Sequence, residues 1–259
     1  MGSSEPVPER RLTILHTSDL HNKLDEESAA RLRELKRSDP DSLMLDSGDA
    51  IWAGNAYWRP GGEPIFDLMN SVPYDAMCMG NREFHFLDAG IRAKLSKTGF
   101  PILSANLRSC AGKLASASVT VLPHAVFTLS GLRVAVFGLT VPCVTRGAFL
   151  HRVFGNCFDQ PVPAGVKAAE ALRAECDVLI ALTHIGIERD RELARRAPGI
   201  DLILGGHTHT VTNEPERLGD TVILHCGSHA RRVCRVAIEV ADRPKVVSHD
   251  LLPLRGRSD

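Results

Sequence analysis

An α/β fold is predicted by three features of this sequence. Short apolar segments typical of buried strands alternate with amphipathic segments typical of helices. Several of the apolar segments run directly into clusters of Asp, Asn and His. With 44% hydrophobic residues, the 259-residue chain can bury a large core without disulfides. Ligand sites in open α/β sheets lie beyond the carboxyl ends of the strands, so these clusters predict one shared crevice.

Each polar cluster follows a strand-like segment. The segments and their clusters are 12–16 with 17–21, 43–46 with 47–49, 75–79 with 80–83, 178–182 with 183–184, and 201–204 with 205–209. The clusters supply seven candidate metal ligands, which are Asp19, His21, Asp49, Asn81, His184, His207 and His209. Seven donors are too many for one tetrahedral zinc, but they suit two divalent ions that share a carboxylate.

The donor types also favour particular metals. Carboxylate, amide oxygen and imidazole together favour Mn²⁺, with Fe or Zn²⁺ as alternatives, over a metal that prefers thiolate. Taken alone, most of these clusters are equally typical of ordinary turns, because Gly, Asp and Asn adopt turn conformations easily. The most specific cluster is 205–209, where Gly205 and Gly206 permit a tight turn and His207 and His209 face one pocket. The metal site is predicted from the ordered combination.

The helices are predicted from apolar periodicity. In residues 26–38, Ala29, Leu32 and Leu35 share one side and basic residues occupy the other. Further helices are expected near 64–71, 87–97, 166–175 and 189–196.

The remaining strands are predicted to be antiparallel. Residues 119–127 and 133–139 flank Ser130-Gly131, a pair typical of a β-hairpin turn. Residues 222–225, 233–240 and 245–251 are also expected to form antiparallel strands.

Composition excludes several classes of partner. Lys plus Arg equals Asp plus Glu, at 31 each, and the few aromatic residues show no alternation with basic ones, so there is no strong nucleic-acid signature. No apolar run approaches the ~18–20 residues that span a bilayer, and the first ten residues lack a secretory apolar region. Seven cysteines without a C-x-x-C pair indicate reduced thiols, which predicts a cytoplasmic protein. The oligomeric state stays open.

The five clusters, in this order, resemble the blocks of the calcineurin-like metallophosphoesterase superfamily. Within it, the chain is similar to the catalytic domain of the 5′-nucleotidase branch, which includes 2′,3′-cyclic nucleotide phosphodiesterases. The resemblance implies a four-layer αββα sandwich with two mixed β-sheets flanked by helices. It implies one domain over residues 11–254, with tails at 1–10 and 255–259.

The resemblance also implies a role for each candidate ligand. Asp19, His21 and His209 would hold one ion, Asn81, His184 and His207 a second, and Asp49 would bridge them. The reaction implied is hydrolysis of a small-molecule phosphate ester, either a phosphomonoester or a cyclic or activated phosphodiester. A metal-bound hydroxide would attack phosphorus, without a phosphoenzyme.

The third block departs from the family pattern. Where the family has Gly-Asn-His-Glu-Phe-Asp, this chain has Gly80-Asn81-Arg82-Glu83-Phe84-His85. Arg82 therefore replaces the usual catalytic His; a guanidinium clamps phosphate but cannot donate a proton. Good leaving groups should be favoured. Asn81, Arg82 and His85 are the predicted catalytic residues, with His85 supplying the proton if residues 82–85 form a helical turn. The alternative is a structural His85.

Substrate contacts are predicted for Arg82, Arg146 and His229, although a structural role for His229 is an open alternative. Trp52, in the loop after Asp49, either borders the cleft or packs on the surface. Because the chain ends at Asp259, we expect no C-terminal nucleobase clamp of the kind found in the 5′-nucleotidase branch. Two other functions stay open: a 5′-nucleotidase acting on free nucleotides, and a weakly active metal-binding sensor or scaffold.

Overall fold

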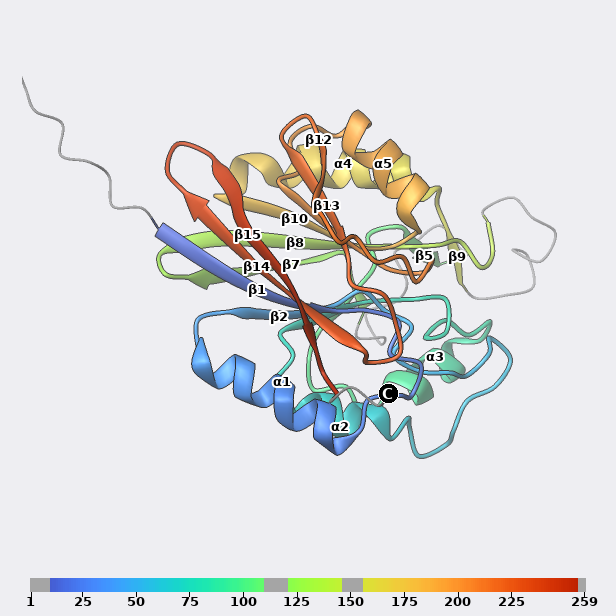
Figure 1. Cartoon of the computed structure of the whole chain (residues 1–259). Helices are drawn as coiled ribbons and strands as arrows, with labels where there is room; N and C mark the ends of the chain where they lie inside the picture. Colours follow the sequence, from blue (N-terminus) through green and yellow to red (C-terminus); the bar gives the residue numbers. More distant parts are fainter. Residues whose placement is uncertain (1–9, 110–120, 146–155, 256–259) are drawn as a thin grey trace, which may run out of the picture.

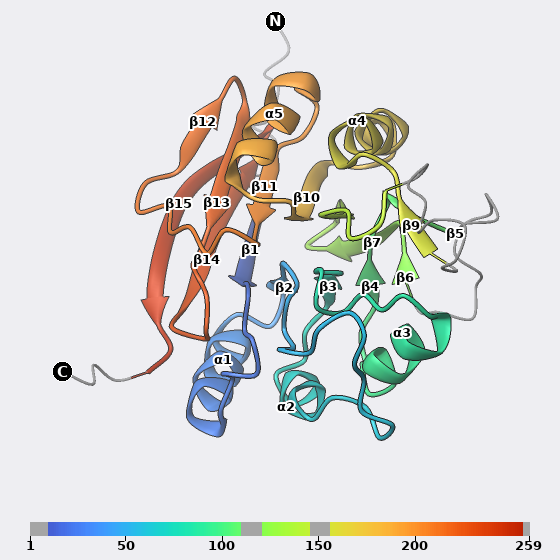
Figure 2. The same cartoon turned by 90° about the vertical axis from the view of Figure 1, so that its right-hand side faces the viewer.

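Two β-sheets face each other and carry helices on both outer sides (Figures 1 and 2). The computed structural model describes residues 10–109, 121–145 and 156–255. The first sheet has the order β15 (Pro244–Pro253), β14 (Arg232–Val240), β1 (Arg10–Thr17), β2 (Leu43–Asp46), β3 (Ala76–Cys78), β4 (Ile102–Leu103) and β6 (Val121–Leu122). The second has the order β12 (Glu216–Leu218), β13 (Thr221–His225), β11 (Leu202–Gly205), β10 (Val178–His184), β8 (Leu132–Thr140) and β7 (His124–Leu129). A separate pair joins β5 (Leu107–Ser109) to β9 (Asn156–Phe158).

The helices complete four layers and confirm the predicted αββα sandwich. The helices are α1 (Glu26–Ser38), α2 (Ile65–Ser71), α3 (Asp88–Leu95), α4 (Pro161–Leu172) and α5 (Ile187–Arg196). In Figure 2, α1, α2 and α3 lie below the sheets, and α4 and α5 lie above them. Both sheets are mixed. In the first, the parallel strands from β1 to β6 adjoin the antiparallel β14 and β15; in the second, parallel central strands are bordered by the antiparallel β12 and β7.

Side-chain alternation along the strands produces three apolar layers. Successive residues of a strand point to opposite faces, so one strand can serve two layers. In β10, Ile180 packs between the two sheets, whereas Leu179 packs toward α4 and α5. In β1, Ile14 likewise packs between the sheets, and Leu15 packs toward α1 and α2. The space between the sheets is therefore filled by apolar side chains up to the edge where the polar clusters begin.

Helix α1 forms over the predicted residues. The Asp25 carboxylate caps its first turn by accepting a hydrogen bond from the Ser28 N–H at 2.9 Å. Acidic residues occupy its first turn and basic residues its last, which complements the helix dipole. Leu32 and Leu35 are buried against the first sheet, as the periodicity predicted.

The other helices differ from their predicted ranges mainly at α4. This helix begins at Pro161, ahead of the predicted 166, and its α-helical part ends at Leu172. A proline is well tolerated in the first turn, where its missing N–H has no intrahelical partner to lose. The predicted end at 175 is instead a short 3₁₀ turn over Arg173–Glu175.

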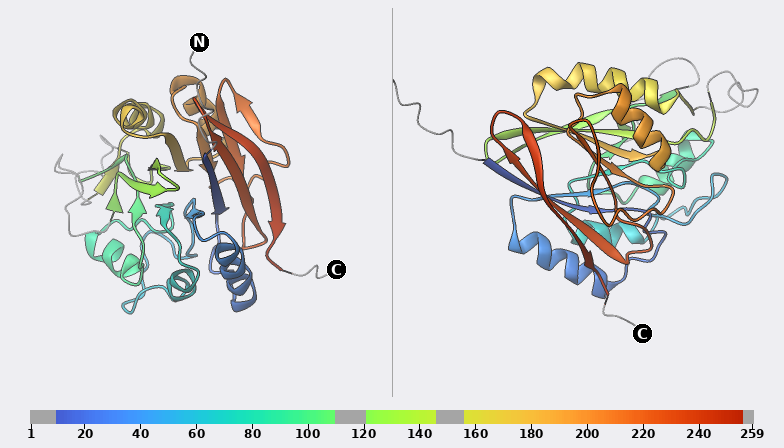
Figure 3. Two further views of the ribbon diagram at one scale, coloured as in Figure 1. Left: turned by 90° about the vertical axis from the view of Figure 1, so that its left-hand side faces the viewer. Right: turned by 45° about the horizontal axis from the view of Figure 1, so that its top comes forward.

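The strand predictions were wrong in two places, the segment 119–127 and β13. The described residues of that segment form two strands, β6 and β7, which are separated by Pro123 and belong to different sheets. β7 and β8 form the expected hairpin, in which Ser130 and Gly131 have φ of 48° and 73°, as a tight hairpin turn requires. Residues 119 and 120 of the predicted strand lie outside the described residues. β14 and β15 are antiparallel as expected and run along one side of the molecule (Figure 3). The prediction was wrong for β13, which pairs parallel to β11 and is antiparallel only to β12. The chain between β11 and β13 runs back to the end of the sheet where β11 begins, so that β13 starts at the same end and has the same direction.

Both ends of the described chain are anchored. Arg10 is the first residue of β1 and pairs with Val240, so the strand begins one residue earlier than the expected tail boundary. Arg255 contacts the Asp25 carboxylate at 2.9 Å. Within the described ranges, no helix has the length and apolar character required to cross a bilayer.

Candidate metal centre

Loops from both sheets meet at one edge of the molecule and line an open cavity of about 190 Å³. The first sheet contributes the residues that follow β1, β2 and β3, and the second contributes those at the ends of β10, β11 and β13. The side chains that line the cavity are His21, Asp49, Trp52, Asn81, Arg82, His207, His209 and His229. The convergence expected from the sequence is therefore present.

Asp19, His21 and His209 form one donor group. The Nε2 atoms of His21 and His209 are 3.0 Å apart. They lie 3.8 Å and 3.4 Å, respectively, from Asp19 Oδ1. Two imidazole nitrogens and a carboxylate oxygen thus face a common point, which is the donor set and spacing of a divalent metal site.

His184 is the centre of a second donor group. Its Nε2 atom lies 3.2 Å from Asn81 Oδ1 and 3.4 Å from Asp49 Oδ1. The ring of His207 is 5.1 Å from the ring of His184, centroid to centroid. Donor atoms of Asp19, Asp49 and His184 lie within 4.8 Å of one another, so Asp19 reaches both groups. The two groups therefore adjoin, with carboxylates between them.

The backbone of these residues is held in an unusual conformation. Asp19, His21, Asp49, His207 and His209 all have positive φ, between 48° and 79°. Residues other than glycine rarely adopt this region, and such strain concentrates at functional sites, where the surrounding structure imposes it. Four of these residues, all but Asp19, line the cavity.

Backbone carbonyls orient two of the imidazoles. His184 Nδ1 lies 2.7 Å from the Ser47 carbonyl oxygen, and His21 Nδ1 lies 3.4 Å from that of Ile51. When Nδ1 donates to a carbonyl, the proton stays on that nitrogen and Nε2 keeps a free lone pair. This arrangement leaves each Nε2 available to a cation.

The charges of the centre favour a bound cation. Burial alone would raise the pKa of Asp19, but a hydrogen bond with His209 and the charge of His184 lower it to about 2. Burial would lower the pKa of His184, but the adjacent Asp49 carboxylate raises it to about 10. Burial lowers the pKa of both His21 and His207, which keeps them neutral. Ionised carboxylates and neutral imidazoles are the forms that bind metal, so a cation at this centre would displace the proton that His184 carries in its absence.

Glu83 fixes the loop that carries Asp49. Its buried carboxylate accepts hydrogen bonds from the N–H groups of Gly80, Asp49 and Ile51 at 2.8, 2.9 and 3.3 Å. Burial and the charge of Asp49 raise its pKa to about 7. Glu83 is not among the predicted site residues, although its place in the third block was a signal.

Arg82 and Trp52 form one wall of the cavity. The Arg82 N–H donates to Asp49 Oδ1 at 2.8 Å, which anchors its backbone. Its guanidinium carbon lies 5.5 Å from the centroid of the Trp52 ring. Trp52 is 56% exposed and makes an edge contact with His21, so it borders the cavity rather than packing into the core. A guanidinium on an indole is thus presented beside the candidate ligands.

His85 lies apart from the cavity-lining residues. The helical turn expected over residues 82–85 does not form, because the turn at Asn81 ends before Phe84. His85 Nδ1 accepts from the Leu87 N–H at 2.9 Å, and its ring packs 4.7 Å from that of Trp58. It is 3% exposed and is packed against Gly90. The geometry that would let His85 share a face with Arg82 is therefore absent.

Of the two other predicted substrate contacts, the structure describes His229 but not Arg146. His229 lines the cavity, and its ring lies 5.3 Å from His21 and 5.4 Å from His209, centroid to centroid. Its N–H donates to the Asp19 carbonyl at 2.8 Å. His229 is therefore positioned beside the first donor group. Arg146 lies outside the described residues.

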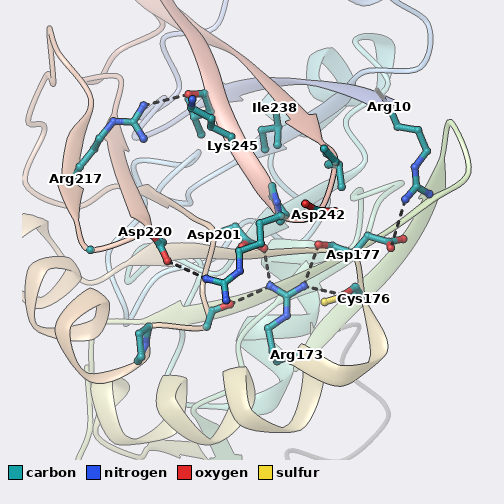
Figure 4. Close-up of a pocket in the computed structure, with 18 residues that line it drawn as sticks. Arg10, Arg173, Cys176, Asp177, Asp201, Arg217, Asp220, Ile238, Asp242 and Lys245 are labelled. Atoms are coloured by element: carbon teal, nitrogen blue, oxygen red, sulfur yellow. Dashed lines mark hydrogen bonds and ion pairs between the residues drawn. The ribbon is translucent and has the colours of Figure 1, made fainter. Parts of the chain in front are cut away.

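A larger cavity of about 800 Å³ lies at the opposite ends of the strands, where β10 and β11 begin (Figure 4). Arg173 crosses it and donates to the Asp201 carboxylate and to the carbonyls of Cys176, Asp177 and Gly199. The guanidiniums of Arg10, Arg217 and Arg243 also have protein partners. Because these groups are paired with the protein, the larger cavity shows no convergent set of ligands.

Buried His16, at the end of β1, should make the metal-free protein sensitive to acid. Its Nε2 lies 2.7 Å from Ser47 Oγ, and burial, with the charge of His225, lowers its pKa from 6.5 to about 3. Between these values the unfolded chain binds more protons, so unfolding becomes easier as the pH falls. This residue alone should lower the free energy of unfolding by about 1.4 kcal/mol per pH unit.

Urea denaturation in EDTA between pH 7 and pH 4 would measure this effect. In the His16→Gln variant, the free energy of unfolding should fall less steeply with decreasing pH than in the native chain. The difference in slope should correspond to nearly one proton, about 1.4 kcal/mol per pH unit. Equal slopes for the two proteins would contradict the assignment to His16.

Two facing mixed sheets, outer helices and a polar site at the carboxyl ends of the strands define the metallo-dependent phosphatase fold. A family model described as calcineurin-like phosphoesterase matches residues 12–211. The chain therefore belongs to the calcineurin-like phosphoesterase family, whose members are metal-dependent phosphoester hydrolases.

Curated relatives place the chain near the nucleotidases. It is 31% identical over 280 residues to the trifunctional nucleotide phosphoesterase protein YfkN of Bacillus subtilis (strain 168), covering 92% of this chain and 19% of that protein. It is 32% identical to a snake venom 5′-nucleotidase of Gloydius brevicauda and 30% identical to the 5′-nucleotidase of Homo sapiens. Both matches cover 77% of this chain, and 37% and 38% of those proteins. The chain thus spans less than half the length of each relative.

Solved structures share the fold. The NAD nucleotidase NadN of Haemophilus influenzae aligns with a TM-score of 0.79 and 20% identity, covering 95% of this chain and 57% of that one. The calcineurin-like phosphoesterase YfkN of Bacillus subtilis aligns with a TM-score of 0.73 and 21% identity, covering 96% and 92%.

Proposed function

We propose that this chain hydrolyses a small-molecule phosphate ester with the aid of two divalent metal ions, of which Mn²⁺ is the best match to the donors. The ligands proposed are Asp19, His21, Asp49, Asn81, His184, His207 and His209. The observation that carries the proposal is the convergence of donors from both sheets at one cavity. Five of the seven line it, and donor atoms of Asp19 and His184 lie within 4.8 Å of Asp49. The substrate proposed is a phosphomonoester or a cyclic or activated phosphodiester.

The residues of the chain divide the work. Bound divalent ions would supply Lewis acidity, which lowers the pKa of water and stabilises charge on phosphoryl oxygens. Asp49 lies next to His184 and supports Arg82 through the hydrogen bond of its carboxylate, so it ties the ligands to the substrate wall. Asn81 offers a neutral amide oxygen beside His184. His229 faces the first donor group, where it would contact substrate.

Arg82 sets the expected preference for leaving groups. Arg82 lines the cavity, and its guanidinium can bind two phosphoryl oxygens at once, but a guanidinium is not a practical proton donor. Because Arg82 cannot protonate a departing oxygen, esters with acidic leaving groups should react fastest. His85 would have to move from its present packing to serve as the proton donor in its place.

A 5′-nucleotidase activity is the second candidate. It is favoured by the 5′-nucleotidases among the relatives and by the exposed indole of Trp52 at the cavity, which could stack on a base. Turnover of nucleoside 5′-monophosphates, compared with simple aryl phosphates, would separate this activity from the broader one. Faster turnover of the aryl esters would count against it.

Removal of metal should abolish hydrolysis. EDTA-treated protein should release no nitrophenol from 4-nitrophenyl phosphate or bis(4-nitrophenyl) phosphate, and added Mn²⁺ should restore both reactions. Calorimetric titration should show two Mn²⁺ ions bound per chain. Binding of two ions without hydrolysis would favour the sensor or scaffold function, and failure to bind Mn²⁺, Fe²⁺ or Zn²⁺ would overturn the proposed centre.

We also propose a cytoplasmic location. It is supported by the free thiols of the six cysteines in the described ranges, since thiols persist in reducing compartments. Fractionation of source cells would test it, and recovery of the protein outside the cytoplasm would contradict it.

A further inference from the structure

Lys94 is a fully buried lysine on α3. Its exposed fraction is 0%, and burial lowers the pKa of its ammonium to about 8. The Nζ atom donates to the carbonyl oxygens of Gly54, Arg82 and Phe84 at 3.0, 2.6 and 2.8 Å. Each of the three N–H bonds of the ammonium therefore has a backbone acceptor.

The buried charge is costly for a purely structural residue. Lysine is almost never fully buried, because removing its ammonium from water carries a large penalty. Its neighbours Ile91 and Leu95 on the same helix are buried and apolar, whereas Lys94 Nζ is surrounded by carbonyl oxygens that require a donor. The burial of the Lys94 ammonium is therefore explained by the carbonyl groups to which it donates.

The acceptors belong to the two loops that carry the Arg82 and Trp52 wall. Arg82 contributes its own carbonyl, and Gly54 lies two residues after Trp52. A further hydrogen bond joins the same loops, from the Phe86 N–H to the Asn55 carbonyl at 3.3 Å. One ammonium thus fixes the backbones on both sides of the contact between the guanidinium and the indole.

We propose that Lys94 is a positioning residue that holds Arg82 against Trp52, so that the guanidinium faces the substrate phosphate. The proposal rests on the proposed function only for the contact between Arg82 and phosphate. Lys94 itself lies behind the wall and is not among the residues that line the cavity. It acts through the carbonyl of Arg82 rather than by touching substrate.

A double-mutant cycle tests whether Lys94 acts through Arg82. Lys94→Met should lower kcat/KM for 4-nitrophenyl phosphate by about 10–10²-fold, chiefly through KM, because small displacements of a substrate-binding group are costly. The same change made in an Arg82→Ala background should have little further effect. Lys94→Gln, which keeps two donors, should retain part of the activity and serves if the Met variant does not fold. Lys97→Met, on a half-exposed neighbouring lysine, is the matched control.

Fluorescence of Trp52 supplies a readout that does not depend on activity. In a Trp58→Phe background, Trp52 is the one remaining tryptophan of the chain. Lys94→Met should shift its emission and raise its quenching by acrylamide, whereas Lys97→Met should change neither. Unchanged Trp52 fluorescence, or an undiminished effect of Lys94→Met in the Arg82→Ala background, would overturn the proposal. Absence of hydrolysis by the native chain would overturn the proposed function instead, while the fluorescence comparison would still decide the role of Lys94.

Discussion

The Asp49→Asn variant should lose Mn²⁺-dependent hydrolysis of 4-nitrophenyl phosphate by about 10³-fold. Asp49 lies 3.4 Å from His184 and is ionised, because the charge and hydrogen bond of that imidazole outweigh the effect of burial on its pKa. The amide has nearly the same shape but lacks the charge, so metal binding and charge stabilisation should both weaken. A loss of ~4 kcal/mol corresponds to this factor.

The substitution is designed to spare the local structure. The amide oxygen of Asn can still accept the hydrogen bond that the Arg82 N–H gives to Asp49 Oδ1. Asp250→Asn, on an exposed carboxylate paired with Arg235, is the matched control and should keep full activity. Native-like turnover by Asp49→Asn, with two ions still bound, would refute the role of Asp49 in the centre.

Arg82→His should restore a proton donor and raise the hydrolysis of alkyl phosphate esters by about 10²-fold, the lower part of the range for acid catalysis. Aryl esters with acidic leaving groups should change little, because they depart without a proton. The ratio of the two rates, measured between pH 5 and pH 8, is the informative quantity.

Arg82→Gln is the control for this comparison. It removes the charge without supplying an acid, so it should weaken binding of both ester types and leave their ratio unchanged. If Arg82→His and Arg82→Gln behave alike on alkyl esters, the preference for good leaving groups has another cause.

The elements could be predicted where local signals agree with the fold. Helix α1 has an N-cap, complementary charges at its ends and a buried apolar stripe, and its predicted range needed no change. Helix α4 begins at Pro161, ahead of the predicted start at 166, because a proline is well suited to the first turn of a helix. The direction of β13 could not be predicted locally, since strand pairing depends on the path of the chain between residues 205 and 220.

The candidate ligands could be predicted from the sequence, but the residues that hold them in place could not. Residues such as Asp19 and His207 stand directly after strands, where the sequence points to a crevice. The sequence does not indicate that Lys94 is buried, because a lysine in a helix is ordinarily exposed to solvent. Only the tertiary structure shows its hydrogen bonds to backbone carbonyls. The placement of His85 could not be predicted for the related reason that it depends on packing against Trp58.

The donors of each proposed ion come from both sheets. Asp19 and His21 follow β1 of the first sheet, whereas His209 follows β11 of the second. Likewise, Asn81 follows β3 of the first sheet, whereas His184 is the last residue of β10 in the second. The affinity for metal should therefore depend on the relative position of the two sheets. A sliding of one sheet over the other by a fraction of an ångström, caused by a repacked side chain deep between them, would separate the donors while leaving every helix and strand intact.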